Sequence, residues 1–320
     1  MRKTSTIACL GGLALLLAAG AARASCGSAF CVLNTNWSTQ GVASDPGTLR
    51  LDMRFEFIDQ QHLQAGSHRI SQAEDTADTT ELRTINRNLL TTLDYTFSKN
   101  WAASVSVPVV DRFHSHIDDP TSAATVETWN FTKIGDTRVL GFYRFDNEKN
   151  PFVNYGLNFG VKLPTGDYKV TNADGAAAER SLQPGTGSTD AVLGAYYSAP
   201  GFHQDSSWWA QVLAQQAVAT TDGFRPGNQY QFNVGYRYPF SDALQGLLQV
   251  NSLVKGRDSG VNAEPDLSGS KSVFLSPGLS YSITHDTQLY SFVQLPIYRY
   301  YNGIQLSVDW AVVAGFTMRF

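Results

Sequence analysis

Residues 305–320, QLSVDWAVVAGFTMRF, alternate between two kinds of side chain along their whole length. Every second position from Leu306 to Phe320 is apolar, and the positions between them are polar or small apart from Val313. A period of two is that of a β-strand with one apolar and one polar face. Strands of soluble domains usually have about 5–6 residues, whereas a tilted strand needs about 9–11 residues to cross a bilayer. The stretch therefore favours a membrane-crossing strand over the edge strand of a soluble sandwich.

A second alternating stretch begins at Thr48 and carries charges on one face. Its apolar face holds Leu49, Leu51, Met53, Phe55 and Phe57, and its polar face holds Arg50, Asp52, Arg54 and Glu56. Four charges on one face of one strand do not suit a dry core, but they suit the water-filled interior of a membrane barrel. The mean hydropathy of -0.20 and the aromatic content of 12% fit a barrel whose two faces differ in polarity.

The same alternation recurs to the end of the chain and predicts about twelve strands. Short polar turns, such as residues 98–100 and 146–150, alternate with long connections, such as residues 164–189. Even strand numbers and this alternation are typical of up-and-down barrels with both ends in the periplasm. A soluble sandwich predicts no such alternation. We therefore expect an all-β, transmembrane, antiparallel barrel over residues 48–320, with outer-membrane lipid around it.

The first 24 residues have the pattern of a cleaved secretory signal peptide. Arg2 and Lys3 precede an apolar run, and Ala22-Arg23-Ala24 matches a cleavage site. Cleavage removes three of the 24 basic residues, so 21 face 28 acidic ones and the charge is near -7, which argues against nucleic acid as a partner. Cys26 and Cys31 then remain as a pair in an oxidising compartment, and we expect a disulfide in a periplasmic segment over residues 25–47.

Side chains alternate between the two faces of each strand, and this alternation assigns a set of charged residues to the barrel interior. Basic residues outnumber acidic ones in this set. The set is Arg50, Asp52, Arg54, Glu56, Asp94, Arg112, Arg138, Arg144, Lys162, Arg237, Asp309 and Arg319. Rings of charge set the selectivity of channels, so one interpretation is a channel that favours anionic or carboxylated small solutes. The alternative is a salt-bridged network that stiffens a narrow, nearly closed lumen, because twelve strands lie between filled barrels and open porins.

Several motifs resemble the outer-membrane family named for the meta-pathway of phenol degradation. They are Gly135-Asp136, GVKLPTGD (residues 160–167), LQPGTGSTD (residues 182–190) with Gly194, Ser276-Pro277-Gly278 and PIYRYYNG (residues 296–303). The resemblance implies a barrel of the uptake-channel kind in the outer membrane of a Gram-negative bacterium, with aromatic or other hydrophobic small molecules as cargo. A strand that ends in Phe320 also resembles the signal read by the barrel-assembly machinery, which it implies as a partner.

Four of the six histidines, His62, His68, His114 and His116, occur near acidic residues in stretches that we expect to be external loops. Imidazole and carboxylate groups together suit zinc, copper, iron or nickel. A surface metal-binding or adhesive barrel is therefore the alternative function, against a hydrophilic rim with scattered histidines. No Cys-x-x-Cys-His haem motif is present, so we expect no cofactor. No triad-like cluster has a supporting motif, so we expect no enzyme.

Overall fold

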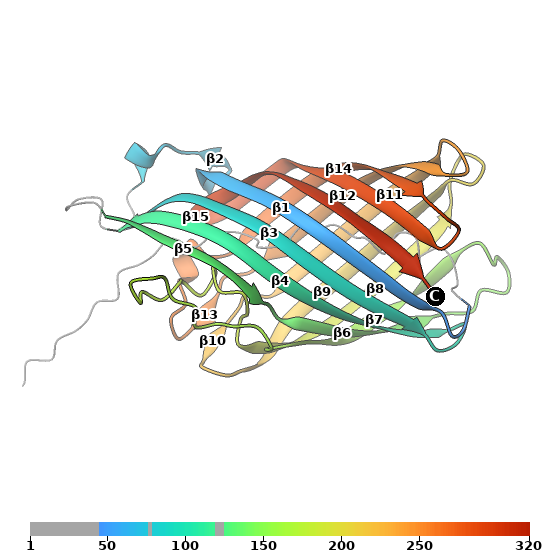
Figure 1. The fold of residues 1–320 in the computed structure, drawn as a ribbon, viewed down its shortest axis with the longest axis horizontal. Coiled ribbons are helices and arrows are strands. Elements are labelled where there is room, and N and C mark those ends of the chain that lie inside the picture. The colour runs from blue at the N-terminus through green and yellow to red at the C-terminus, as the bar shows by residue number, and fades with distance from the viewer. Residues whose placement is uncertain (1–44, 76–78, 119–124) are drawn as a thin grey trace, which may run out of the picture.

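The computed structural model describes residues 45–75, 79–118 and 125–320, and these form a closed antiparallel β-barrel (Figure 1). The signal peptide and the Cys26–Cys31 pair lie outside the described residues, so both remain predictions. The wall strands are β1 (Leu49–Gly66), β3 (Thr79–Thr96), β4 (Trp101–Asp118), β6 (Thr137–Arg144), β7 (Asn154–Leu163), β8 (Ser188–Pro200), β9 (Ser207–Thr220), β11 (Gln229–Pro239), β12 (Leu244–Lys255), β14 (Ser270–Ser282) and β15 (Thr287–Arg319).

The remaining elements lie at the end of the barrel that carries the long connections, here called the external end. They are β2 (His68–Arg69), β5 (Thr125–Ile134), β10 (Phe224–Arg225), β13 (Ser259–Gly260) and the short 3-10 helices η2 (Gln72–Glu74) and η3 (Pro265–Leu267). β6 pairs with the periplasmic half of β4, and β5 pairs with the external half of the same strand. Among the described residues, no helix is long and apolar enough to cross a membrane.

β15 contributes two crossings of the wall because it doubles back at Asn302-Gly303. Gly303 has a φ of 62°, in the left-handed region that favours glycine. The amide of Arg319 donates to the carbonyl of Asp286 at 2.9 Å, which places the two ends of β15 side by side. The eleven wall strands of the described chain therefore cross twelve times, in agreement with the sequence pattern.

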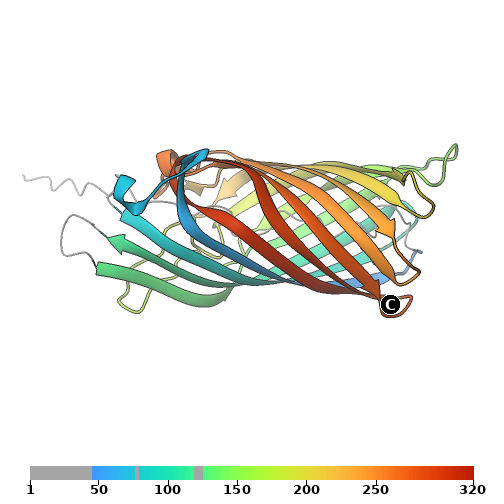
Figure 2. The same cartoon turned by 90° about the horizontal axis from the view of Figure 1, so that it is seen from above.

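The barrel closes where the chain begins and ends. β15 pairs with β1 from Arg50↔Arg319 to Gly66↔Tyr301. Leu49 and Phe320 exchange both of their backbone hydrogen bonds, at 3.2 and 2.9 Å. Figure 2 shows the C-terminus at the end opposite to the external loops, which is the periplasmic end. No strand edge of the wall is left open at this seam, which removes the backbone groups that lipid could not satisfy.

The outer surface of the wall is apolar and ends in aromatic residues toward the periplasm. Large apolar side chains such as Leu93, Val105, Phe159 and Leu193 are exposed there. Aromatic pairs follow one another around the periplasmic ends of the strands: Tyr95–Phe97, Trp101–Tyr143, Phe145–Tyr155, Tyr197–Trp208 and Tyr238–Phe240. An apolar band with such an aromatic girdle is the lipid-facing surface of an outer-membrane barrel.

Three neighbouring strands are much longer than a membrane crossing requires. β1, β3 and β4 have 18 residues each, roughly 60 Å of strand at 3.3 Å per residue. Their external halves therefore rise beyond the membrane and form a tall wall on one side. The stretches around His62, His114 and His116, expected to be external loops, belong to these outer halves, whose polar and charged residues resemble loops in the sequence.

Candidate functional site

The interior face of β1 holds alternating charges that pair with close neighbours. Arg50 donates to Asp94 on β3, with nitrogen–oxygen distances of 2.5 and 2.7 Å. Arg54 pairs with Glu56, two residues further along the same face, at 2.7 Å. The Glu56 side chain has no exposed surface. The charged face that the sequence assigned to the lumen is therefore inside the barrel, and it is tied into ion pairs.

Asp52 connects β1 to the two arms of β15. Its carboxylate accepts hydrogen bonds from the Tyr290 hydroxyl at 2.9 and 3.1 Å and from the Thr317 hydroxyl at 2.8 Å. All three side chains are buried. These contacts fix one carboxylate beneath the seam that closes the barrel.

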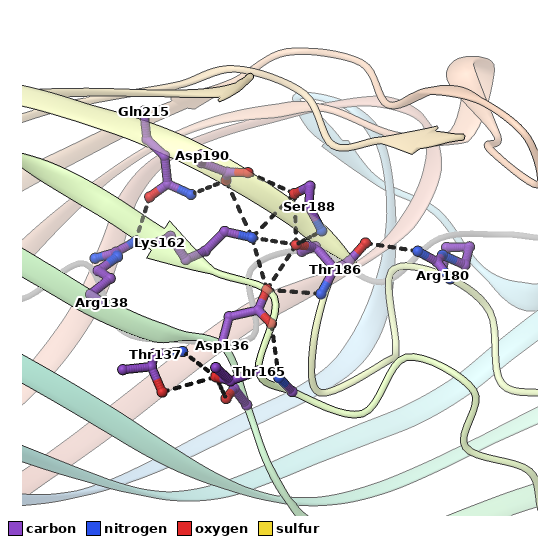
Figure 3. A network of polar contacts seen from close by, with 12 residues as sticks. Asp136, Thr137, Arg138, Lys162, Thr165, Arg180, Thr186, Ser188, Asp190 and Gln215 are labelled. Carbon is purple, nitrogen blue, oxygen red and sulfur yellow. Dashed lines mark hydrogen bonds and ion pairs between the residues drawn. The ribbon is translucent and has the colours of Figure 1, made fainter. Parts of the chain in front are cut away.

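A second polar network surrounds Lys162 on β7 (Figure 3). The Lys162 ammonium lies 2.8 Å from Asp136 Oδ2 and 3.3 Å from Asp190 Oδ2 and also contacts the Thr186 hydroxyl. Asp190 accepts from Gln215 at 2.6 Å, and Gln215 in turn accepts from Arg138 at 2.7 Å. Asp136 and Asp190 occur in the motifs quoted above, but neither was predicted to face the lumen. Both lie beside Lys162, and their position at strand ends was the signal available in the sequence.

The glycine motifs meet at this network and fold residues 164–187, the β7–β8 loop, into the barrel. Asp136 accepts from the amides of Gly166 at 3.1 Å and Thr186 at 2.9 Å. A Cβ atom on Gly185 would lie 2.6 Å from the Gly166 carbonyl oxygen and 2.7 Å from Asp136 Oδ1, so only glycine fits. Segments that are far apart in sequence therefore converge to form the base of one loop.

The β7–β8 loop crosses to the opposite wall. Leu182 is fully buried in an apolar cluster with Leu63 of β1, Leu306 of β15, Trp129 of β5 and Ala178 of the loop. In the order of strands around the barrel, β1 and β15 lie on the far side from β7 and β8. The loop therefore spans the external end of the lumen.

Polar contacts hold the loop in this position. Arg112 on β4 donates to the Leu182 carbonyl at 2.5 Å and to Asn86 Oδ1 at 2.7 Å. The Trp129 indole donates to the Ala176 carbonyl at 3.1 Å. Farther out, the Arg180 guanidinium pairs with Asp222 at 2.7 Å. These contacts fasten the loop to β4, to β5 and to the connection between β9 and β10.

Below the loop the lumen wall is divided into two halves. Charged inward residues gather on β1, β3, β6, β7 and β8. The inward positions of β9, β11, β12 and β14 carry no charged side chain between Arg237, near the periplasmic end, and Lys255, near the external end. Their side chains are apolar or neutral polar: Trp209, Gln211, Asn233, Leu247, Gln249, Asn251, Phe274 and Ser276.

Side chains pack closely in the interior beside β1, β12 and β14. Glu56, Asn251 and Ser276 have no exposed surface although they face the interior. Ser276 donates to Asn251 Oδ1 at 2.8 Å, and Gln294 donates to Ser276 at 3.3 Å. A narrow, stiffened lumen, the alternative stated above, remains a prediction.

The other predicted lumen residues lie toward the two ends of the barrel. Arg144, Arg237 and Arg319 are half-buried near the periplasmic end, and Arg237 donates to the Ser207 hydroxyl at 3.1 Å. Asp309 lies at the external end, where it pairs with His62 at 2.8 Å and Arg69 at 2.7 Å, both about half exposed. The expected place of Asp309 among the lumen residues is therefore wrong.

The cause is a β-bulge. Asp59 pairs with Trp310 but Gln60 pairs with Val308, so Asp309 has no partner across the strands and the faces of β15 exchange beyond it. Leu306 and Val308, expected on the lipid face, are buried inside instead. The alternation of side chains in the sequence does not reveal a bulge. One extra residue then moves every side chain beyond it to the opposite face from the one predicted.

The four predicted histidines lie in strands and not in external loops. His114 and His116 lie inside strand β4, both buried, with His114 Nε2 and His116 Nδ1 3.2 Å apart and Trp129 packed against both rings. His62 lies in β1 and His68 in β2. In residues 45–75, 79–118 and 125–320, no group of three or more His, Cys, Asp or Glu residues is placed to hold a metal ion. A metal site at these histidines remains a prediction.

Comparison with solved structures finds outer-membrane barrels. An outer membrane channel from Pseudomonas putida F1 is 12% identical and matches with a TM-score of 0.66, over 88% of this chain and 98% of that one. Two further matches are the KdgM porin in complex with oligogalacturonate (TM-score 0.45, 10% identity, 85% of this chain and 99% of that one) and the CymD monoaromatic hydrocarbon channel (TM-score 0.44, 8% identity, 87% and 89%). Comparison with curated proteins finds no match.

At these identities the first likeness shows the fold alone. The closed barrel and its lipid-facing exterior are the architecture of Gram-negative outer-membrane proteins, and the chain is such a protein. The family model described as "Putative MetA-pathway of phenol degradation" matches residues 84–302, about two thirds of the sequence and all of the motifs at the base of the β7–β8 loop. The chain belongs to this family.

Proposed function

We propose that the protein is a narrow, solute-selective channel of the outer membrane, and that its cargo is a small aromatic carboxylate or a compound of similar character. The observation that carries this proposal is the division of the lumen wall into a charged half and an uncharged half. A carboxylate that leaves water needs a charge-assisted partner, and Arg138 and Arg54 supply guanidinium groups on the charged half. An aromatic ring needs apolar surface, which Trp209, Phe274 and Phe292 supply opposite.

The closely packed side of the interior and the β7–β8 loop across its external end favour facilitated passage of one solute at a time over open diffusion. A solute would have to displace side chains in the interior and move the β7–β8 loop at its external end. Because the Leu182 cluster is apolar, a solute with an apolar edge can replace its contacts at little cost, whereas a sugar or an inorganic ion cannot. We accordingly propose a transport role rather than a catalytic one.

Uptake by proteoliposomes tests this function. The purified barrel should admit benzoate at least tenfold faster than a neutral sugar or benzylamine of similar size, and it should show only low conductance in planar bilayers. Arg138→Gln should slow benzoate about tenfold, since a hydrogen bond to a charged group contributes about 1.5–3 kcal/mol. Arg257→Gln, an exposed external residue, is the matched control. Equal uptake of benzoate and benzylamine, or no effect of Arg138→Gln in a folded barrel, would refute the proposal.

The alternative, a surface metal-binding or adhesive barrel, has less support, because the four predicted histidines are spread over β1, β2 and β4, and His114 and His116 are buried. Calorimetry separates the two functions. Stoichiometric zinc or copper binding that is lost in the His114→Ala/His116→Ala variant would favour the alternative.

A further inference from the structure

Charged side chains on the lipid-facing side of the wall gather in one sector. By strand parity, Asp59 of β1, Arg83 and Arg87 of β3 and Asp111 of β4 point outward, above apolar neighbours on the same strands. The outward positions of β6, β7, β8, β9, β11 and β12 carry no charged side chain. On the rest of the described wall, Lys271 near the external end of β14 is stacked on Tyr300, and Asp309 of β15, paired with His62 and Arg69, lies next to Asp59 at the edge of this sector. We call the four residues the outer charged sector.

Each arginine in the sector is held along one edge by a carboxylate. Arg83 donates through Nε and Nη2 to the two oxygens of Asp59, both at 3.0 Å. Arg87 donates through Nε to Asp111 Oδ1 at 2.5 Å, and the Thr132 hydroxyl holds Asp111 Oδ2 at 2.7 Å. The arginine side chains remain 44% and 42% exposed. The carboxylates therefore orient the guanidinium groups and leave Nη1 of Arg83 and both Nη atoms of Arg87 turned to the surroundings.

The height of the sector matches the outer boundary of the membrane. Arg87 lies eight residues from Tyr95 of the periplasmic girdle, which is about 26 Å along the strand. With a strand tilt of about 45°, Arg87 stands roughly 19 Å and Arg83 roughly 28 Å above Tyr95. The apolar band of such barrels is about 25 Å tall. The two arginines therefore bracket the level at which the headgroups of the outer leaflet lie.

We propose that the outer charged sector binds the headgroup of a bis-phosphorylated glycolipid of the outer leaflet. Guanidinium forks match the oxygens of phosphate and form charge-assisted pairs with it. Arg83 and Arg87 are four residues apart on one face, about 13 Å, so each takes one phosphate at opposite ends of a disaccharide-sized headgroup. Ile85 lies between them, Phe57 lies directly across from Arg87 on β1, and Val109 lies across from Leu89 on the membrane side of Arg87, where the acyl chains would pass.

The carboxylates explain why a lipid with two phosphates is favoured over one with a single phosphate. Because Asp59 and Asp111 balance the two arginines, the sector has little net charge to attract anions from a distance. Binding then depends on short, directed hydrogen bonds from both arginines at once. A phospholipid such as phosphatidylglycerol reaches only one of them.

Native mass spectrometry in mild detergent tests the proposal with the full-length barrel. Purified lipid A with two phosphates, monophosphoryl lipid A and phosphatidylglycerol are titrated separately. The parent should bind the bis-phosphorylated lipid at least tenfold more tightly than either of the others. Arg83→Gln/Arg87→Gln should remove that preference, and Lys149→Gln/Arg257→Gln, which removes two exposed charges elsewhere, should keep it.

Folding is checked by heat-modifiable migration in gels, and the single variants Arg83→Gln and Arg87→Gln serve if the double variant does not fold. Each single variant should reduce the tenfold preference for the bis-phosphorylated lipid to about threefold, which is half of it on a logarithmic scale. Asp111→Asn provides an opposite test, because it frees the Arg87 fork and should keep or strengthen binding. Equal affinity of the parent for all three lipids, or an unchanged preference in the folded arginine variants, would overturn the proposal.

Discussion

Lys162 is the residue on which the inner polar network depends. Its ammonium lies between the carboxylates of Asp136 and Asp190, and its side chain is 7% exposed. Lys162→Gln leaves two buried carboxylates side by side, and removal of one partner of a buried ion pair costs about 3–5 kcal/mol. We expect the temperature at which the barrel loses its compact, fast-migrating form to fall clearly. Lys149→Gln on the periplasmic turn should leave that temperature unchanged.

Adding one methyl group at Gly185 tests whether close packing at the base of the β7–β8 loop holds the loop in place. Gly185→Ala places a carbon 2.6 Å from the Gly166 carbonyl oxygen, where neither backbone can yield easily. We expect the loop to leave its position and the single-channel conductance to rise, while the barrel remains folded. The control is Gly256→Ala, whose new carbon meets its nearest atom at 3.4 Å. An unchanged conductance in Gly185→Ala would show that the loop does not limit passage.

Strand parity in the sequence could place most interior residues, because the alternation of β1 is unbroken from Leu49 to Phe57. It could not place Asp309, Leu306 or Val308, since the bulge at Asp309 leaves no mark in hydrophobicity. His114 and His116 were assigned to a loop because a buried pair of histidines looks the same in sequence as an exposed one. Only their packing against Trp129 distinguishes the two cases.

At the scale of elements, the β7–β8 loop is a removable unit. The amide of Gly185 donates to the Asp167 carbonyl at 2.7 Å, so the two ends of residues 168–184 already lie together. Replacing those residues by two glycines should leave the strands in register and remove Leu182 and Ala176 from the external end. We expect conductance and the uptake of neutral sugars to increase severalfold in bilayers and proteoliposomes. A folded deletion variant with parental conductance would place the barrier among the packed side chains of the interior instead.

The sequence predicted this loop as one of the long connections, over residues 164–189. It could not predict the anchor points, because Arg112, Trp129 and Asp222 lie on other elements and their contacts form only in the folded chain. The outer parts of β1 and β4 that hold His62, His114 and His116 were expected to be loops for a related reason. Polar residues on both faces of the outer halves of β1, β3 and β4 hide the strand period.

At the scale of the whole molecule, closure depends on the last residue. Phe320 exchanges two backbone hydrogen bonds with Leu49, and its side chain is 67% exposed on the lipid side. We therefore expect Phe320→Asp to reduce the amount of heat-modifiable barrel in the outer membrane severalfold, by placing a charge at the seam and by weakening recognition by the assembly machinery. Refolding into detergent distinguishes the causes, because a defect only in cells points to recognition. Phe152→Asp, an exposed aromatic on a periplasmic turn, is the control.

The twelve-crossing fold was predictable as a whole because membrane barrels repeat one pattern many times, and an error in one strand leaves the others intact. The lumen was less predictable, because its chemistry depends on which strands face one another across the interior.

The fixed charges lie on one side of the lumen, and they should therefore orient a molecule inside it. If the protein transports solutes as proposed, the charges on β1 and β6 attract the polar groups of a solute toward one side of the lumen rather than along the pore axis. The molecule is therefore turned to a constant angle before it advances, and its width in that direction limits its progress. Positional isomers of equal mass and charge, such as ortho- and para-hydroxybenzoate, should then pass at different rates, and a flux assay with the two isomers would measure this alignment directly.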